Sequence, residues 1–200
     1  MSAYPPFFDD IEPIATYDPL ADTLGAAKEG KIVYEYADMV KLAGHSCPTV
    51  AGAWLMTKVG LQKLYGEALP VRGNVKVEIR EALDEGVAGV IGSCIGLVTG
   101  AAGEGGFKGL GGKMARNNRL LFGIEMGAEV RMTRLDNAAH VEMSYNPSLV
   151  PGDPRMQPLM QKIMQGQADA EEKALFGELW QERVRKILLE VPSEELVSCS

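Results

Sequence analysis

The stretch Gly44-His45-Ser46-Cys47-Pro48, with the apolar run 49–65 behind it, constrains this chain more than any other. Pro48 presets φ for a first helical turn, and Gly66 offers a stop after the run. The apolar side chains of the run fall in two adjacent stripes at helical spacing. We therefore predict a mostly buried helix over residues 48–65.

His45 is one of two histidines and Cys47 one of three cysteines in the 200 residues. On extended backbone, side chains two residues apart point to the same face. We expect Cys47 at or just before the helix N-terminus, where free N–H groups and the helix dipole favour a thiolate. A thiolate beside an imidazole is either half of a metal site or a nucleophile with its base.

The composition excludes several classes of protein. The formal charge of −7, from 27 acidic and 20 basic residues, argues against nucleic acid or an anionic membrane as partner. No apolar run approaches the roughly 18 residues of a membrane-spanning helix. The first residues do not resemble a secretory signal, and three widely spaced cysteines make no disulfide framework. We expect a protein of a reducing compartment, the cytoplasm.

Proline-rich segments divide the chain into three parts. Residues 1–30 are expected to form an extended arm with a short helix near 19–28, and the aromatic side chains near its start should pack on the rest of the molecule. Residues 31–150 form the predicted core. Four prolines between positions 147 and 158 mark a boundary, and residues 151–200 form a helical extension.

Within these parts, periodicity predicts a helix over 31–42 and helices over 159–164 and 170–189. Strands are predicted over 74–80, 128–135 and 140–145, the last two joined by a tight turn at 136–137. Residues 86–97 fit either a buried helix or a covered strand. This order favours an α+β fold: a mainly antiparallel sheet packed against helices, with an added C-terminal helical segment.

Four further residues are candidates for chemistry. Cys94 lies between Gly92 and Gly96, and Lys113 follows a loop with seven glycines among residues 100–112, which does not match a Walker A loop. Lys113 either binds a substrate anion or caps the loop. His140 begins a predicted strand, which suggests a structural role, or it completes a metal shell. Cys199 is expected in a frayed tail.

His45-Ser46-Cys47-Pro48, the segment around Cys94, and Gly112-Lys113 follow one another in that order. Together they resemble the FmdE-like family, which is associated with formylmethanofuran dehydrogenase. The resemblance covers roughly residues 34–145, although Ala43 stands where the family has its first histidine. It implies an α+β fold, an intertwined homodimer, and a pocket near the cysteines that holds a metal such as zinc.

Three functions follow from these residues. The favoured one is a metal-binding accessory or redox protein of a molybdenum- or tungsten-dependent formylmethanofuran dehydrogenase-type system, with His45, Cys47 and Cys94 as zinc ligands and the dehydrogenase complex as a further partner. The second is a metal-free cysteine enzyme, with Cys47 as nucleophile and Lys113 orienting a small acidic substrate. The candidate catalytic residues are thus Cys47, Cys94 and Lys113. The third is a docking protein without a reaction of its own.

Overall fold

The computed structural model describes residues 4–200 and contains a five-stranded sheet. Its strand order is β4-β3-β5-β6-β7, and only the pair β3 and β4 is parallel. The strands span, in chain order, β3 (Val75–Ile79), β4 (Leu120–Leu121), β5 (Val130–Arg134), β6 (His140–Tyr145) and β7 (Val197–Cys199). With helices packed against this sheet, the predicted α+β class is confirmed.

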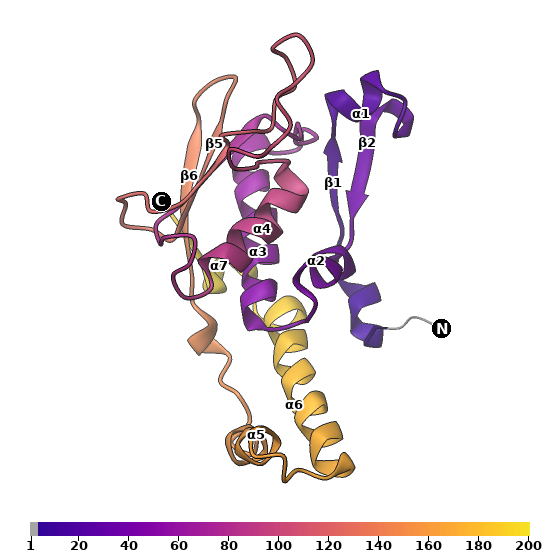
Figure 1. Cartoon of the computed structure of the whole chain (residues 1–200), viewed down its shortest axis with the longest axis vertical. Helices are drawn as coiled ribbons and strands as arrows, with labels where there is room; N and C mark the ends of the chain where they lie inside the picture. Colours follow the sequence, from indigo (N-terminus) through magenta and orange to yellow (C-terminus); the bar gives the residue numbers. More distant parts are fainter. Residues whose placement is uncertain (1–3) are drawn as a thin grey trace.

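Two helices lie side by side against the sheet (Figure 1). The longer one, α3 (Pro48–Tyr65), has the predicted bounds and packs on β5 and β6. The second, α4 (Ala88–Thr99), packs on β3 and settles the ambiguous segment 86–97 in favour of a helix. The shorter α2 (Tyr36–Ala43) contacts both and leads directly into the start of α3.

The N-terminal residues form a separate two-stranded sheet, in which β1 (Ile14–Tyr17) pairs antiparallel with β2 (Lys31–Tyr34). The prediction of one helix over 31–42 is therefore wrong in its first part. A capping box between Glu35 and Asp38 starts α2 only at Tyr36, so the preceding residues pair as a strand instead. The chain between the two strands contains α1 (Pro19–Thr23) and the 3₁₀ turn η2 (Lys28–Gly30).

An aromatic chain holds the N-terminal residues against the core. Phe8, in the 3₁₀ turn η1 (Pro6–Asp10), is buried and packs edge-on against Tyr36 with ring centres 4.9 Å apart. Tyr36 packs edge-on against Trp54 of α3 at 5.8 Å. Such edge-to-face contacts add to the burial of the rings. The expectation that the aromatic side chains near the N-terminus pack on the rest of the molecule is confirmed for Phe8.

Between β6 and β7 the chain forms the 3₁₀ turn η3 (Pro147–Leu149) and the helices α5 (Met156–Met164), α6 (Ala170–Leu189) and α7 (Ser193–Leu196). The C-terminal end of α6 buries Val184 and Ile187 and packs against α3. Its other end projects with α5 away from the rest of the molecule (Figure 1). Cys199 does not lie in a frayed tail, because β7 pairs it with Met143 of β6.

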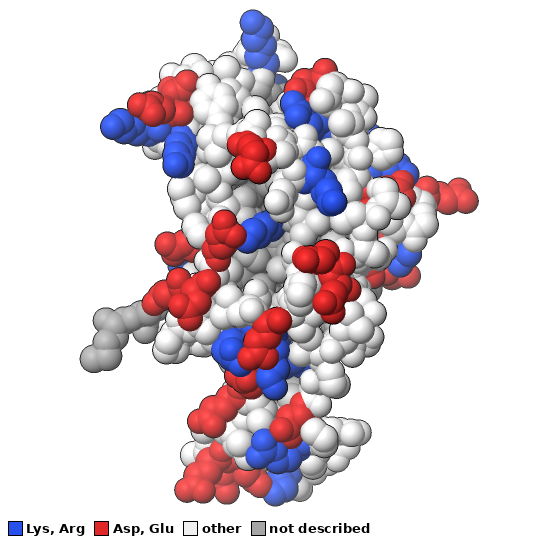
Figure 2. Space-filling model, turned by 180° about the vertical axis from the view of Figure 1, so that it is seen from behind, with Lys and Arg blue, Asp and Glu red and all other residues white. Residues whose placement is uncertain are grey.

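Acidic and basic side chains are interspersed over much of the face shown in Figure 2. Acidic side chains gather at the projecting end, where α6 begins with Glu171 and Glu172 in its first turn. Among residues 4–200, no helix combines the length and the apolar character needed to cross a membrane.

Two glycines let α3 approach the sheet closely. A Cβ atom on Gly52 would lie 2.3 Å from Cε1 of Tyr145, and one on Gly60 would lie 2.7 Å from Sδ of Met132. Both distances are far shorter than a van der Waals contact. A side chain at Gly52 would collide with the ring of Tyr145, whereas one at Gly60 would displace the flexible ends of Met132 and Met143.

We predict that Gly52→Ala destabilises the fold by about 1–3 kcal/mol, the usual cost of overpacking. Gly177→Ala in α6 is the matched control, because nothing lies within 4 Å of the Cβ position there. This control should gain up to about 1 kcal/mol from its better helix propensity. Urea denaturation measures both, and a Gly52→Ala protein as stable as the wild type would contradict the close approach.

Candidate functional site

Cys47 occupies the N-cap of α3, as the sequence predicts. The chain leaves α2 through Gly44 in the left-handed region (φ 76°), is extended at Cys47, and enters α3 through Pro48. The Cys47 side chain is buried, and its Sγ accepts a hydrogen bond from the backbone N–H of Val50 at 3.5 Å. The helix thus presents a free backbone N–H group to the sulfur.

His45 is exposed, whereas Cys47 is buried. The Nδ1 atom of His45 lies 2.9 Å from the carbonyl oxygen of Ala43, so the ring is held by the turn that ends α2. The structure therefore places the imidazole and the thiol in different surroundings.

Cys94 lies in the middle of α4 and is fully buried. Burial is the main cause that raises the pKa of its thiol to about 11, and the neighbouring Cys47 raises it further. The two thiols therefore interact electrostatically, and both are free rather than joined in a disulfide. A cavity of about 240 Å³ between α2 and α4 adjoins Cys94.

The residue before Cys47 is held by side chains from distant parts of the chain. The carbonyl oxygen of Ser46 accepts hydrogen bonds from Nε1 of Trp180 at 2.9 Å and from Nε2 of Gln181 at 3.2 Å, both on α6. The hydroxyl of Ser46 shares a hydrogen bond with Oη of Tyr36 at 3.1 Å. These contacts fix the backbone at the entrance to α3.

Tyr145, at the end of β6, completes these surroundings. Its ring packs on Gly52 of α3. Burial raises the pKa of its hydroxyl, and the nearby Cys47 raises this pKa further. Within residues 4–200, its Oη and the Oε1 of Gln181 are buried polar atoms without a hydrogen-bond partner. Buried polar groups are normally paired. The two unpaired atoms lie on β6 and α6, the two elements beside the start of α3.

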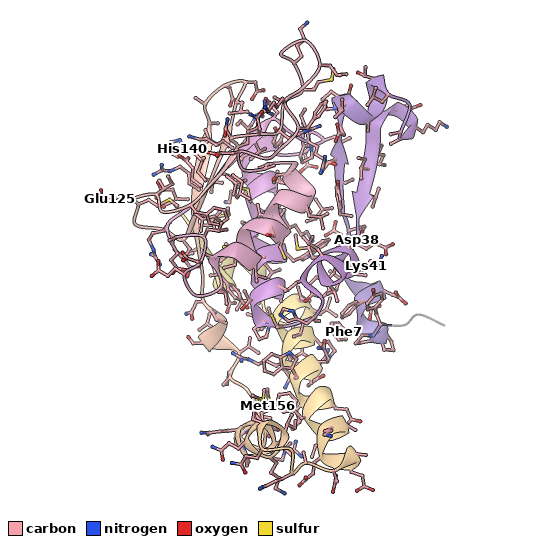
Figure 3. The ribbon with its side chains drawn as sticks, viewed as in Figure 1. Phe7, Asp38, Lys41, Glu125, His140 and Met156 are labelled. Atoms are coloured by element: carbon pink, nitrogen blue, oxygen red, sulfur yellow. The ribbon has the colours of Figure 1, made fainter. Side chains whose placement is uncertain are left out.

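Two other candidates lie elsewhere. Lys113 is exposed in a short turn paired with Leu110, in the loop after α4. That loop lies at the opposite end of α3 from Pro48 (Figure 1). His140 is exposed at the start of β6 and lies across the helices from Asp38 and Lys41 of α2 (Figure 3). Neither residue joins the surroundings of Cys47.

A family model described as "FmdE, Molybdenum formylmethanofuran dehydrogenase operon" matches residues 42–198. This match covers most of the 200 residues. The chain belongs to the FmdE family. A search of the curated proteins finds no match.

The FmdE match runs from residue 42 to residue 198 and thus continues past the C-terminal end of the segment 34–145 that carries the sequence resemblance. It includes α5 and α6, and hence the residues Trp180 and Gln181 that contact Ser46. Sequence reasoning missed these two residues, as it missed Tyr36 and Tyr145. An aromatic residue followed by an amide in the middle of an amphipathic helix is the local signal that Trp180 and Gln181 offer.

The donor chemistry at this FmdE site suits zinc, whose usual protein ligands are cysteine sulfur and histidine nitrogen. The arrangement is incomplete, however. No group of three histidine, cysteine or acidic side chains within residues 4–200 is placed to hold a metal ion. Cys47 and Cys94 form two neighbouring sulfur donors, whereas His45 is turned to Ala43. A single chain in this conformation therefore does not present a preformed zinc site.

The pKa of Cys94 makes stability depend on pH. The folded-state pKa is about 11, above the unfolded value of about 8.5. The contribution of this thiol to the free energy of unfolding is therefore complete below the unfolded-state pKa. It is lost as the pH rises through the folded-state pKa. We expect urea denaturation of the metal-free protein, in which Cys94 holds no zinc, to show a loss of about 3 kcal/mol from this group across that window.

The Cys94→Ala variant should not show this loss of stability at alkaline pH, although it should be less stable than the wild type at neutral pH. Tyr36 and Tyr145, whose pKa values burial also raises, are present in both proteins and contribute nearly equally to the two curves, because Cys94 is only a minor cause of the raised pKa of Tyr36. Wild-type and variant curves that stay parallel from neutral to alkaline pH would show that the thiol of Cys94 is not shielded as described.

Proposed function

We propose that this FmdE-family chain is an accessory protein of a formylmethanofuran dehydrogenase system in the cytoplasm, and that the neighbouring thiols of Cys47 and Cys94 are its functional centre. The observation that carries the proposal is the placement of Cys47 at the N-cap of α3, and its electrostatic influence on the thiol of Cys94 supports it. The family match contains both residues. All three cysteines are free, which suits a reducing compartment.

We propose zinc as the ligand of this centre. Thiolates and imidazole are the donors that zinc takes in proteins, and three protein ligands leave a fourth position for water or substrate. Cys47 and Cys94 supply the two sulfur donors. His45 is the third candidate, because it lies two residues from Cys47 and its exposed ring needs only to leave the carbonyl of Ala43. When bound, zinc would act as a Lewis acid.

Elemental analysis of the protein purified without an affinity tag tests this proposal. We expect nearly stoichiometric zinc in the wild type and its loss in Cys47→Ser. Cys199→Ser is the matched control, because Cys199 lies exposed on β7 and should not affect the metal content. Folding of each variant is checked by thermal unfolding. A folded Cys47→Ser protein that keeps its zinc would rule out Cys47 as a ligand.

A metal-free thiol centre is the second candidate, favoured by the hydrogen bond from the N–H of Val50 to the sulfur of Cys47. Iodoacetamide labelling with peptide mapping separates the two. If chelator exposes Cys47 to labelling, a metal covers it. If no metal is found and Cys47 labels faster than the exposed Cys199, the nucleophile remains. Slow labelling of Cys47 under both conditions would leave only a docking role.

We also propose that the chain forms a homodimer through the apolar side chains beside the cavity at Cys94. Leu42, at the edge of this cavity, is 49% exposed, and Leu83 and Val87 near the start of α4 are 61% and 46% exposed. Exposed apolar side chains that gather in this way are typical of interfaces. A second copy would cover them and close the cavity.

Analytical ultracentrifugation should therefore give about twice the chain mass of 21.6 kDa. Leu42→Glu should shift the equilibrium toward monomer, because it places a charge in the apolar contact. Leu24→Glu is the control, since Leu24 is also exposed but follows α1 in the N-terminal part. A monomeric wild type, or a dimer that both variants leave intact, would refute this interface.

A further inference from the structure

Three arginine side chains gather around a second cavity, of about 170 Å³, lined by Arg72, Arg116 and Arg119. The cavity lies where the start of α1, the turn before β3 and the segment before β4 meet. It shares no lining residue with the cavity at Cys94. Its role is thus separate from the proposed function of the thiol centre.

One carboxylate faces these three cations. Asp18 is 3% exposed, and its two oxygens accept hydrogen bonds from Nη1 of Arg72 at 2.9 Å and from Nη2 of Arg116 at 2.6 Å. The backbone N–H groups of Leu20 and Ala21 also donate to Oδ1 of Asp18. Asp18 therefore neutralises one of the three positive charges. Its two carboxylate oxygens already accept hydrogen bonds from these four groups.

Arg119 has no such partner. Among residues 4–200 no carboxylate forms an ion pair with it, and its guanidinium makes no hydrogen bond to another residue. Burial alone lowers its pKa, with no acidic group opposing the shift. The Nε atom of Arg72, which lines the same cavity, is buried and has no hydrogen-bond partner among residues 4–200. The cluster thus carries two unneutralised positive charges.

The backbone is shaped to admit the most buried of these side chains. Arg116 is 6% exposed, and its Nη1 lies 1.4 Å from the position that a Cβ atom on Gly73 would take. Nη1 also lies 2.9 Å from the corresponding position on Gly100. Both glycines have positive φ, at 83° and 74°. Burying more cations than the one carboxylate can pair with is costly, so the cluster is suited to a bound anion.

We infer that this cavity binds a phosphate group, either inorganic phosphate or the phosphate of a phosphorylated metabolite. The two surplus charges match a phosphate monoester, which carries about −1.5 to −2 at neutral pH. The planar guanidinium donates paired hydrogen bonds to phosphate oxygens. The cavity is smaller than the roughly 300–1,000 Å³ of sites for whole drug-sized ligands, so it holds the phosphate group and little more.

Isothermal titration calorimetry of the full chain at constant ionic strength tests this inference. The probes are inorganic phosphate, glycerol 3-phosphate, sulfate and acetate. We expect saturable binding of phosphate and much weaker binding of the monoanion acetate. Tighter binding of glycerol 3-phosphate than of inorganic phosphate would assign the site to a phosphorylated metabolite, and the reverse order to inorganic phosphate.

Arg119→Gln should weaken phosphate binding by at least about tenfold, the effect of losing one charged hydrogen-bond donor. It leaves both ion pairs of Asp18 intact, so the fold should persist. Arg155→Gln is the matched control, because Arg155 pairs only with Asp153 at the surface near α5. Arg119→Lys keeps the charge and should bind phosphate more tightly than Arg119→Gln.

Three results would overturn the inference: no saturable binding of phosphate or glycerol 3-phosphate, equal affinities in wild type and Arg119→Gln, or equal losses in Arg119→Gln and Arg155→Gln. If Arg119→Gln does not fold, Arg119→Lys is compared with Arg155→Gln instead. A phosphate affinity of Arg119→Lys equal to that of the wild type would refute a role for the guanidinium of Arg119.

Discussion

The close contact between α3 and the strands β5 and β6 is the constraint on which the rest of the structure depends. Gly52 and Gly60 remove the side chains that would separate helix and sheet, so Tyr145 and Met132 reach the helix backbone. This contact sets the position of the N-terminus of α3 and therefore of Cys47. It also leaves the other sides of α3 to α4 and to the end of α6, which bring Cys94 and Trp180.

Elements with a clear local signal, whether helix ends or the alternation of β3, β5 and β6, could be predicted from the sequence, and short strands that only a distant partner defines could not. Pro48 and Gly66 mark the ends of α3, and the capping box of Asp169 with Glu172 marks the start of α6, so both helices have their predicted bounds. By contrast, β2 is a strand because it pairs with β1, and β7 is a strand because it pairs with β6. Short apolar segments do not reveal such partners.

The same distinction applies to the candidate site. The position of Cys47 at a helix start follows from Pro48, whereas Cys94 became a candidate through the family resemblance, and its role stays a prediction. The hydrogen bonds of Trp180 and Gln181 to Ser46 join residues more than 130 positions apart, and no periodicity or motif encodes them. Lys113 illustrates the opposite error, since it follows the cysteines in sequence order but lies at the other end of α3.

The N-terminal residues are part of both sites although they precede the family match, which begins at residue 42. Tyr36 bonds to the hydroxyl of Ser46 beside Cys47, and Asp18 holds Arg72 and Arg116 in the second cavity. The aromatic contacts of Phe8 with Tyr36 and of Tyr36 with Trp54 connect these residues to α3. A change in the packing of this segment therefore reaches the thiol centre through Tyr36 and the arginine cluster through Asp18.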